Sequence, residues 1–188
     1  HFVLIGGYLG FTFLVTFGLP IWAALVMAIV TAIFMGLLIE RLILRPLLGE
    51  PVLAVVMATI ALSTVLGGLA TLLWGAEYKA YHGLLPTINL KVGAISVPSE
   101  SLIGLIVSVI CVAIPMIVLR SATLGLAMRA TAEDLQVVQS VGIRATTVYA
   151  VSWVIASVVG VIGGILLGGV SGANMELATI GLKAFAVV

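Results

Sequence analysis

The side chains best able to bind a substrate are hydroxyls set within a long apolar run. Thr59 and Ser63 stand four residues apart in the run 52–74, so a helix would place both on one face. Hydroxyls in that position could line a polar path for a small zwitterion or an amide. Threonine and serine in membrane helices also bond backbone carbonyls of their own helix, and the sequence leaves that structural role open as well.

Groups for catalysis or metal binding are missing from the apolar runs. None of these runs contains Glu, Asp or His, and the sequence has no HExxH, GxSxG or paired-aspartate motif. The single cysteine, Cys111, lies in an apolar run, as a small buried hydrophobe would. We therefore expect a protein that is not an enzyme and needs no cofactor or metal. Intramembrane charges that mark ion coupling are missing too, so transport would draw its energy from another subunit.

The composition requires a lipid-facing surface around these groups. Of the 188 residues, 63% are hydrophobic and only 8% are charged, with a mean hydropathy of +1.38. Soluble domains carry about 25% charged residues, so this chain cannot cover a soluble surface. The net charge of +1 comes without a basic patch, which argues against a nucleic-acid partner. We predict an all-α, polytopic bundle of transmembrane helices in contact with membrane lipid.

The apolar runs predict about five to six spans, at roughly 20 residues per crossing. The runs are 2–19, 21–39, 52–74, 102–119 and 148–169, and a further one begins at Ala178. Pro115 predicts a kink or an early end in the fourth run. The chain begins without Met inside one apolar stretch and stops inside another, so we interpret residues 1–188 as one transmembrane domain, truncated at both ends.

The cationic residues divide the connections into two sets. The arginines all lie in residues 40–50 and 120–147, whereas the lysines all lie in residues 75–100 and 171–183. Because cytoplasmic connections carry an excess of positive charge, the arginine set is predicted to be cytoplasmic. Residues 75–100 then form an external loop, irregular in pattern but able to hold a short hairpin.

Three glycines in the last complete run recur at a spacing of four residues. Gly160, Gly164 and Gly168 would form a ridge of missing side chains along one helix face. In lipid such a ridge lets two helix backbones approach closely, which favours a tight contact within the chain or with another subunit. A hinge or a break that lines a cavity is the alternative interpretation.

The stretch RATAEDLQVVQSVGIRATT, residues 129–147, is the most polar part of this apolar chain. Thr131 followed by Asp134 resembles a capping box, which predicts a helix from Ala132 to Val141. Gly142 stands where glycine commonly ends a helix. So short a helix is marginal alone. A partner that docks on it would explain its presence, and physics alone also leaves open a solvated or interfacial loop helix.

The stretch GLAMRATAEDLQVVQSVGIR resembles the coupling loop of the LivH-like permeases, the branched-chain amino acid permeases of ABC importers. The stretches ERLILRPLLGEPVLAVVMATIALS (40–63) and GLKAFAVV (181–188) agree with the same family. The likeness extends from about Glu40 to the end of the sequence. Val137 and Val138 depart from the small alanines expected in the coupling motif, and Ala61 replaces an expected glycine.

The resemblance implies a translocating subunit in the bacterial inner membrane. It implies ABC ATPase subunits, a homologous second permease subunit and an extracytoplasmic solute-binding protein as partners. It also implies that the loop 121–146 is where the ATPase couples, and the coupling residues would be Arg129, Thr131, Glu133, Asp134, Gly142 and Ile143. A permease for urea or short amides and an ion-gradient-driven secondary transporter are the alternatives.

Overall fold

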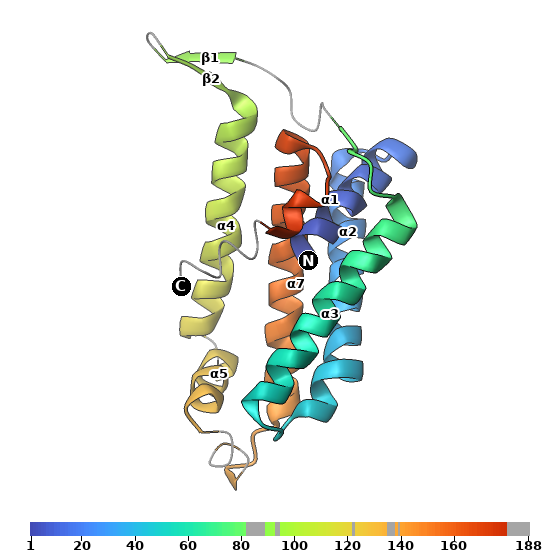
Figure 1. Cartoon of the computed structure of the whole chain (residues 1–188). Helices are drawn as coiled ribbons and strands as arrows, with labels where there is room; N and C mark the ends of the chain where they lie inside the picture. The colour runs from blue at the N-terminus through green and yellow to red at the C-terminus, as the bar shows by residue number, and fades with distance from the viewer. Residues whose placement is uncertain (82–88, 93–94, 122, 135–137, 139, 180–188) are drawn as a thin grey trace.

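The protein is a bundle of long apolar helices with a small hairpin at one end (Figure 1). The computed structural model describes residues 1–81, 89–92, 95–121, 123–134, 138 and 140–179. The helices are α1 (Phe2–Phe11), α2 (Ile21–Ile39), α3 (Val52–Trp74), α4 (Ser99–Ser121), α5 (Thr123–Glu133) and α7 (Ala145–Ser171), and the strands are β1 (Asn89–Val92) and β2 (Ile95–Pro98).

Two of the helices continue beyond their α-helical part. α1 runs on into a π-helical turn over Thr12–Thr16. α2 is followed without a break by a π-helical turn, Glu40–Leu44, and by a 3-10 turn, Arg45–Leu47. The second span is therefore one helical run of 27 residues from Ile21 to Leu47.

The predicted all-α membrane bundle is confirmed. Within the described residues, four helices are long and apolar enough to cross a membrane, at Ile21–Leu47, Leu53–Trp74, Leu102–Arg120 and Ala145–Ser171. The first predicted run forms a shorter apolar helix, Phe2–Thr16. Residues 176–179 are helical where a sixth run was expected to begin, and residues 180–188 lie outside the described part of the chain.

Prolines and glycines fix the helix boundaries. Pro20 and Pro51 directly precede α2 and α3, where their fixed φ suits a helix start and no amide donor is lost. Gly75 and Gly172 end α3 and α7 with φ of 79° and 75°, values that side chains disfavour. The predicted early end at Pro115 is wrong, because α4 continues through it to Ser121. Membrane helices tolerate proline because neighbouring groups satisfy the freed carbonyl.

The two ends of the bundle differ in structure and charge. At the hairpin end, β1 pairs antiparallel with β2, which confirms the short hairpin that the sequence allowed. α4 starts at Ser99, so the expected loop 75–100 ends at Pro98. At the opposite end, α5 connects α4 to the start of α7 (Figure 1). We call it the arginine end, because the arginine-bearing connections 40–50 and 120–147 lie there.

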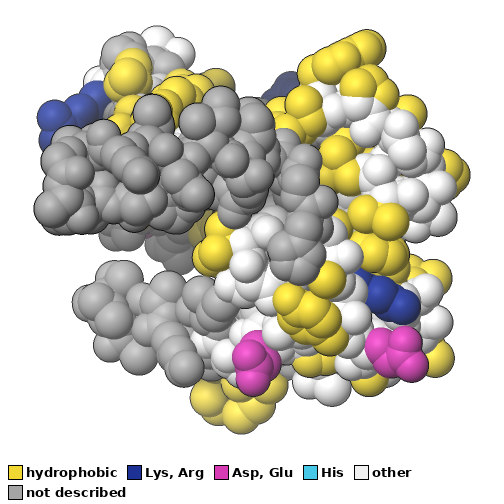
Figure 2. Space-filling model, turned by 90° about the horizontal axis from the view of Figure 1, so that it is seen from above, with side chains coloured by type: hydrophobic (Ala, Val, Ile, Leu, Met, Phe, Trp, Pro, Cys, Tyr) yellow, Lys and Arg dark blue, Asp and Glu magenta, His cyan; other side chains and the backbone are white. Residues whose placement is uncertain are grey.

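α7 lies at the centre of the bundle, with α1 and α2 against it (Figure 1). The α2 face toward α7 consists of small residues, since Ala28 and Ala32 are completely buried. One turn further, Gly36 lies against Ser157 of α7, where a Cβ would collide with the Ser157 hydroxyl. The outward faces are apolar, as lipid contact requires, and large hydrophobic side chains gather around the bundle seen from the hairpin end (Figure 2).

Candidate functional site

The two hydroxyls proposed for a polar path both lie on α3. Thr59 is half-buried, and its hydroxyl donates to the Val56 carbonyl at 2.8 Å. That bond favours the structural alternative for Thr59, because its donor is already used within α3. Ser63 is half-buried beside Leu62 and Leu66, two core residues. The structure thus keeps Ser63 next to the bundle interior.

An acidic residue lies inside the second helical run, contrary to the expectation that no span contains one. Glu40 is 5% exposed, because the helix continues past Ile39 to Leu47 instead of ending there. Its Oε1 atom has no hydrogen-bond partner among the described residues. A buried carboxyl oxygen without a hydrogen bond costs free energy.

The loop at the arginine end differs from the predicted helix over 132–141. α5 begins at Thr123, because residues 124–130 are themselves mostly good helix formers, and it ends at Glu133. Thr131 is therefore no N-cap: it lies in the last turn of α5 and is 9% exposed. Its hydroxyl donates to the Ala127 carbonyl at 2.6 Å. Residues 135–137 and 139, including Val137, lie outside the described residues.

Gly142 ends the helical turn that follows α5. Its φ is 87°, in the left-handed region that glycine adopts without strain. The Ile143 amide donates to the Val138 carbonyl at 3.2 Å, the bond expected when glycine terminates a helix in a Schellman motif. Val138 is 4% exposed, so this turn is anchored to the protein. The expected helix end at Gly142 is confirmed.

The charged residues of this loop face outward. Arg129, Glu133 and Asp134 are all exposed, and the first two stand four apart on α5. α5 itself is held firmly, since a Cβ at Gly125 would fall on the Leu119 carbonyl of α4. α5 also contacts α7. α5 therefore joins the ends of two candidate spans.

The glycine ridge of α7 is filled by groups of the same chain. A Cβ at Gly164 would fall on the Val3 carbonyl and lie 2.8 Å from the Gly7 nitrogen, both in α1. A Cβ at Gly160 would lie 2.7 Å from the Phe2 Cβ. At Gly168 the neighbour is the Tyr81 ring instead of a helix backbone. α1 therefore lies almost backbone to backbone on α7.

The segment that follows α3 crosses the hairpin end of the bundle. Lys79 and Ala173 exchange two backbone hydrogen bonds of 2.9 Å, which tie this segment to the end of α7. The Tyr81 hydroxyl donates to the Ile165 carbonyl at 3.1 Å. Burial raises the pKa of Tyr81, so the hydroxyl keeps the proton that it donates. The segment thus closes the space between α1 and α7.

Trp74 fastens the end of α3 to α1. Its indole stacks on the Tyr8 ring, with centroids 5.4 Å apart, and its Nε1–H donates to the Thr12 hydroxyl at 2.6 Å. Trp74→Phe keeps an aromatic ring but removes the donor. We expect it to lower the free energy of unfolding by about 1 kcal/mol, measured by thermal melting in detergent. Trp22→Phe is the control, since Trp22 is 71% exposed on the lipid-facing side, and an equal loss there would contradict the assignment.

A cavity of about 440 Å³ lies among α1, α2, α4 and α7. Its walls are apolar, with Leu14, Leu25, Val107 and Leu166 among them. Ser108 also lines it, but the Ser108 hydroxyl donates to the Gly104 carbonyl of its own helix at 2.7 Å. The cavity therefore offers hydrocarbon contacts and no charged anchor for a zwitterion. Across the described part of the chain, no cluster of three His, Cys, Asp or Glu side chains could hold a metal.

The four long apolar helices of the described residues define a multi-pass membrane protein. The chain belongs to the family described as the branched-chain amino acid transport system permease component, whose model matches residues 1–188. It is similar to the high-affinity branched-chain amino acid transport system permease protein BraD of Pseudomonas aeruginosa. The two are 30% identical over 179 residues, which cover 88% of this chain and 58% of the relative. No solved structure matches the chain.

Proposed function

We propose that this chain is the translocating part of an ABC importer permease for branched-chain amino acids, powered by ATPase subunits that are separate chains. The match of the family over residues 1–188 is the observation that carries the proposal. The chain spans 58% of the length of its BraD relative, so the importer's activity, substrate and partners are part of the proposal. The membrane would be the bacterial inner membrane, with the arginine end in the cytoplasm.

The ATPase would dock on the loop 121–146. The exposed charges of this loop include Arg129 and Glu133, which could form ion pairs with a partner, and α5 contacts both α4 and α7. ATP-driven movement of the partner would therefore change the packing of two spans together. Coupling requires only that the ATPase bind one permease conformation more tightly than another. A homologous second permease subunit and an extracytoplasmic solute-binding protein would complete the importer.

The substrate would pass beside α3, where Ser63 borders the bundle interior and Thr59 stands one turn away. A neutral zwitterion suits the described spans, since Glu40 is the only acidic residue within the candidate spans and lies near the arginine end of its helix. Urea or a short amide would be equally neutral, so substrate competition has to distinguish among these solutes. Glu40 is also the carboxyl of the candidate spans that an ion-gradient-driven carrier could use to bind its coupling ion. Uptake therefore has to be measured with ionophores that collapse the ion gradients as a control.

Charge reversal on the loop tests the docking site. Glu133→Lys in the full-length protein should weaken its complex with the ATPase encoded beside it by about tenfold, because an exposed charge that steers docking is inverted. Co-elution in mild detergent at several salt concentrations measures the loss. Glu77→Lys is the matched control, since Glu77 is an exposed acid at the hairpin end. Equal binding by wild type and Glu133→Lys would remove this loop from the interface.

A further inference from the structure

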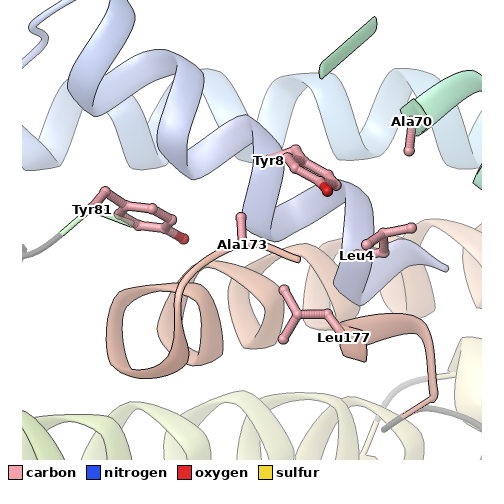
Figure 3. Packing of buried hydrophobic residues seen from close by; sticks show 6 residues of the cluster. All are labelled: Leu4, Tyr8, Ala70, Tyr81, Ala173 and Leu177. Carbon is pink, nitrogen blue, oxygen red and sulfur yellow. The ribbon is translucent and has the colours of Figure 1, made fainter. Parts of the chain in front are cut away.

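The helix α7 is packed tightly on one side and loosely on another. On the side of α1 and α3, Tyr8, Tyr81 and Leu177 belong to a cluster of buried side chains (Figure 3). Toward α4, the same helix borders the cavity of about 440 Å³. None of the residues 102–120 of α4 is buried. Protein interiors leave few voids larger than a water molecule, so a space of this size is expected to hold a ligand.

The cavity exists because glycines stand where side chains would otherwise fill it. Gly104 of α4 and Gly163 of α7 both line the cavity, and a Cβ at either position would meet nothing within 4 Å. Gly164, the next residue of α7, lies against α1 instead. The face of α7 that packs on α1 and the face that borders the cavity are therefore neighbours on one helix.

The cavity lies in the half of the bundle toward the hairpin end. Its α2 wall includes Ile21 and Leu25, at the start of that helix, and its α4 wall includes Ile103 and Val107, in the first half of α4. The α7 wall is part of the second half of α7 and extends to Val170. All these segments adjoin the hairpin end (Figure 1). Because the three helices are candidate spans, the cavity lies at the depth of the lipid chains of one leaflet.

The cavity opens onto the lipid-facing surface. Ile21, Leu25 and Val170 line it and are also exposed on the outside of the bundle, so lipid reaches its mouth. Ser108 is the polar residue of the wall, and its hydroxyl already donates to the Gly104 carbonyl. A buried water needs two to four polar partners, and a zwitterion needs charged or hydrogen-bonding ones. These walls therefore favour hydrocarbon over water and over an amino acid.

We propose that this cavity binds one acyl chain of a membrane lipid from the leaflet at the hairpin end. An apolar cavity of about 150 Å³ inside a soluble protein stays dry and binds benzene, and the cavity here has about three times that volume. The bilayer that covers the mouth supplies acyl chains at high concentration. The inference requires only that these helices cross a membrane, so it does not depend on the proposed function.

The bound chain would support α4 at the hairpin end. At the other end α4 is held by α5, where Gly125 packs on the Leu119 carbonyl. Beside the cavity, the Val107 and Leu166 side chains face a void and lose dispersion contacts there. An acyl chain restores those contacts on both walls. The lipid would thus form part of the packing between α4 and α7.

Photochemical labelling from the lipid tests the site in the full-length protein, embedded in nanodiscs of phosphatidylethanolamine and phosphatidylglycerol. A small fraction of the lipid would carry a diazirine near the end of one acyl chain, and mass spectrometry would locate the labelled residues. We expect labelling of Leu166, on the cavity wall, to match that of Leu72, which is 84% exposed on α3. Gly163→Phe fills the cavity and should lower the labelling of Leu166 by about tenfold, because excluding two methylene groups weakens hydrocarbon binding at least that much.

Gly68→Phe is the matched control. A Cβ at Gly68 also meets nothing within 4 Å, but this glycine lies on α3, away from the cavity walls of α1, α2, α4 and α7. It should leave the labelling of Leu166 as in the wild type. Gly104→Phe fills the cavity from the α4 wall and repeats the test if Gly163→Phe fails to fold, which its melting temperature would reveal.

The pattern of labelling decides between the possible occupants. Loss of Leu166 labelling in the filled variants, with Leu72 labelled throughout and Gly68→Phe like the wild type, supports the inference. A wild type labelled at Leu72 but not at Leu166 would mean that another protein segment closes the cavity, which overturns it. Labelling of Leu166 that neither Gly163→Phe nor Gly104→Phe reduces would mean that lipid reaches this residue from outside the cavity, and this result also overturns it.

Discussion

Gly164→Leu is expected to separate α1 from α7 and to prevent the bundle from forming. The added Cβ alone would occupy the position of the Val3 carbonyl, and the rest of the side chain would meet Gly7. These neighbours are backbone atoms, which cannot rotate away as a side chain can. The expected loss is at least about 3 kcal/mol of the free energy of unfolding, enough to unfold many domains. Loss of the monodisperse peak on size exclusion in detergent would show it.

Gly163→Ala provides the matched control, because this glycine is the next residue of the same helix. A Cβ at Gly163 would meet nothing within 4 Å, and the residue lines the apolar cavity. Alanine also has the higher helix propensity, so Gly163→Ala should leave the protein as stable as the wild type or slightly more stable. A Gly164→Leu protein that elutes and melts like the wild type would mean that α1 does not pack on α7 as described.

Gly142→Val is expected to uncouple the permease from its ATPase while the helices still insert. The backbone here has a φ of 87°, and a β-branched residue adopts that conformation at a cost of about 1–2 kcal/mol. The turn would relax by releasing the bond from the Ile143 amide to Val138. If the ATPase binds only the loop conformation seen here, that cost is subtracted from the free energy of binding and should weaken ATPase docking by about tenfold. ATP-dependent uptake and co-elution with the ATPase both measure it.

Asparagine supplies the control at the same position. Gly142→Asn adds a polar side chain but tolerates a positive φ far better than valine does. It should therefore keep most of the docking that Gly142→Val loses. If both variants bind the ATPase as the wild type does, the turn at Gly142 has no part in coupling. If both lose binding equally, the glycine matters for close contact with the partner and not for its backbone conformation.

Hydropathy was sufficient to predict the membrane bundle, because lipid contact forces nearly every outward side chain to be apolar. The prolines at 20 and 51 and the glycine at 142 also marked helix boundaries that the structure has. Local patterns misled where two signals competed. Thr131 and Asp134 resemble a capping box, but helix formers before them extend α5 through Thr131, whose hydroxyl then bonds within the helix.

Tertiary features were harder to predict, since they depend on which faces meet. Ala24, Ala28, Ala32 and Gly36 recur every four residues in the second run, and this spacing could have indicated the contact of α2 with α7. The stack of Tyr8 on Trp74 joins residues far apart in sequence, so periodicity could not reveal it. Burial of Glu40 follows from a π-helical continuation that no local motif announces.

Uptake of labelled leucine into proteoliposomes tests the central claim most directly. The vesicles would hold the full-length protein with its ATPase and second permease subunit, and the solute-binding protein would be added outside. We predict uptake that requires ATP, persists when ionophores collapse the ion gradients, and is inhibited by isoleucine and valine but not by urea. Uptake that follows an ion gradient without ATP would contradict the account, and so would ATP-dependent uptake of urea in place of leucine.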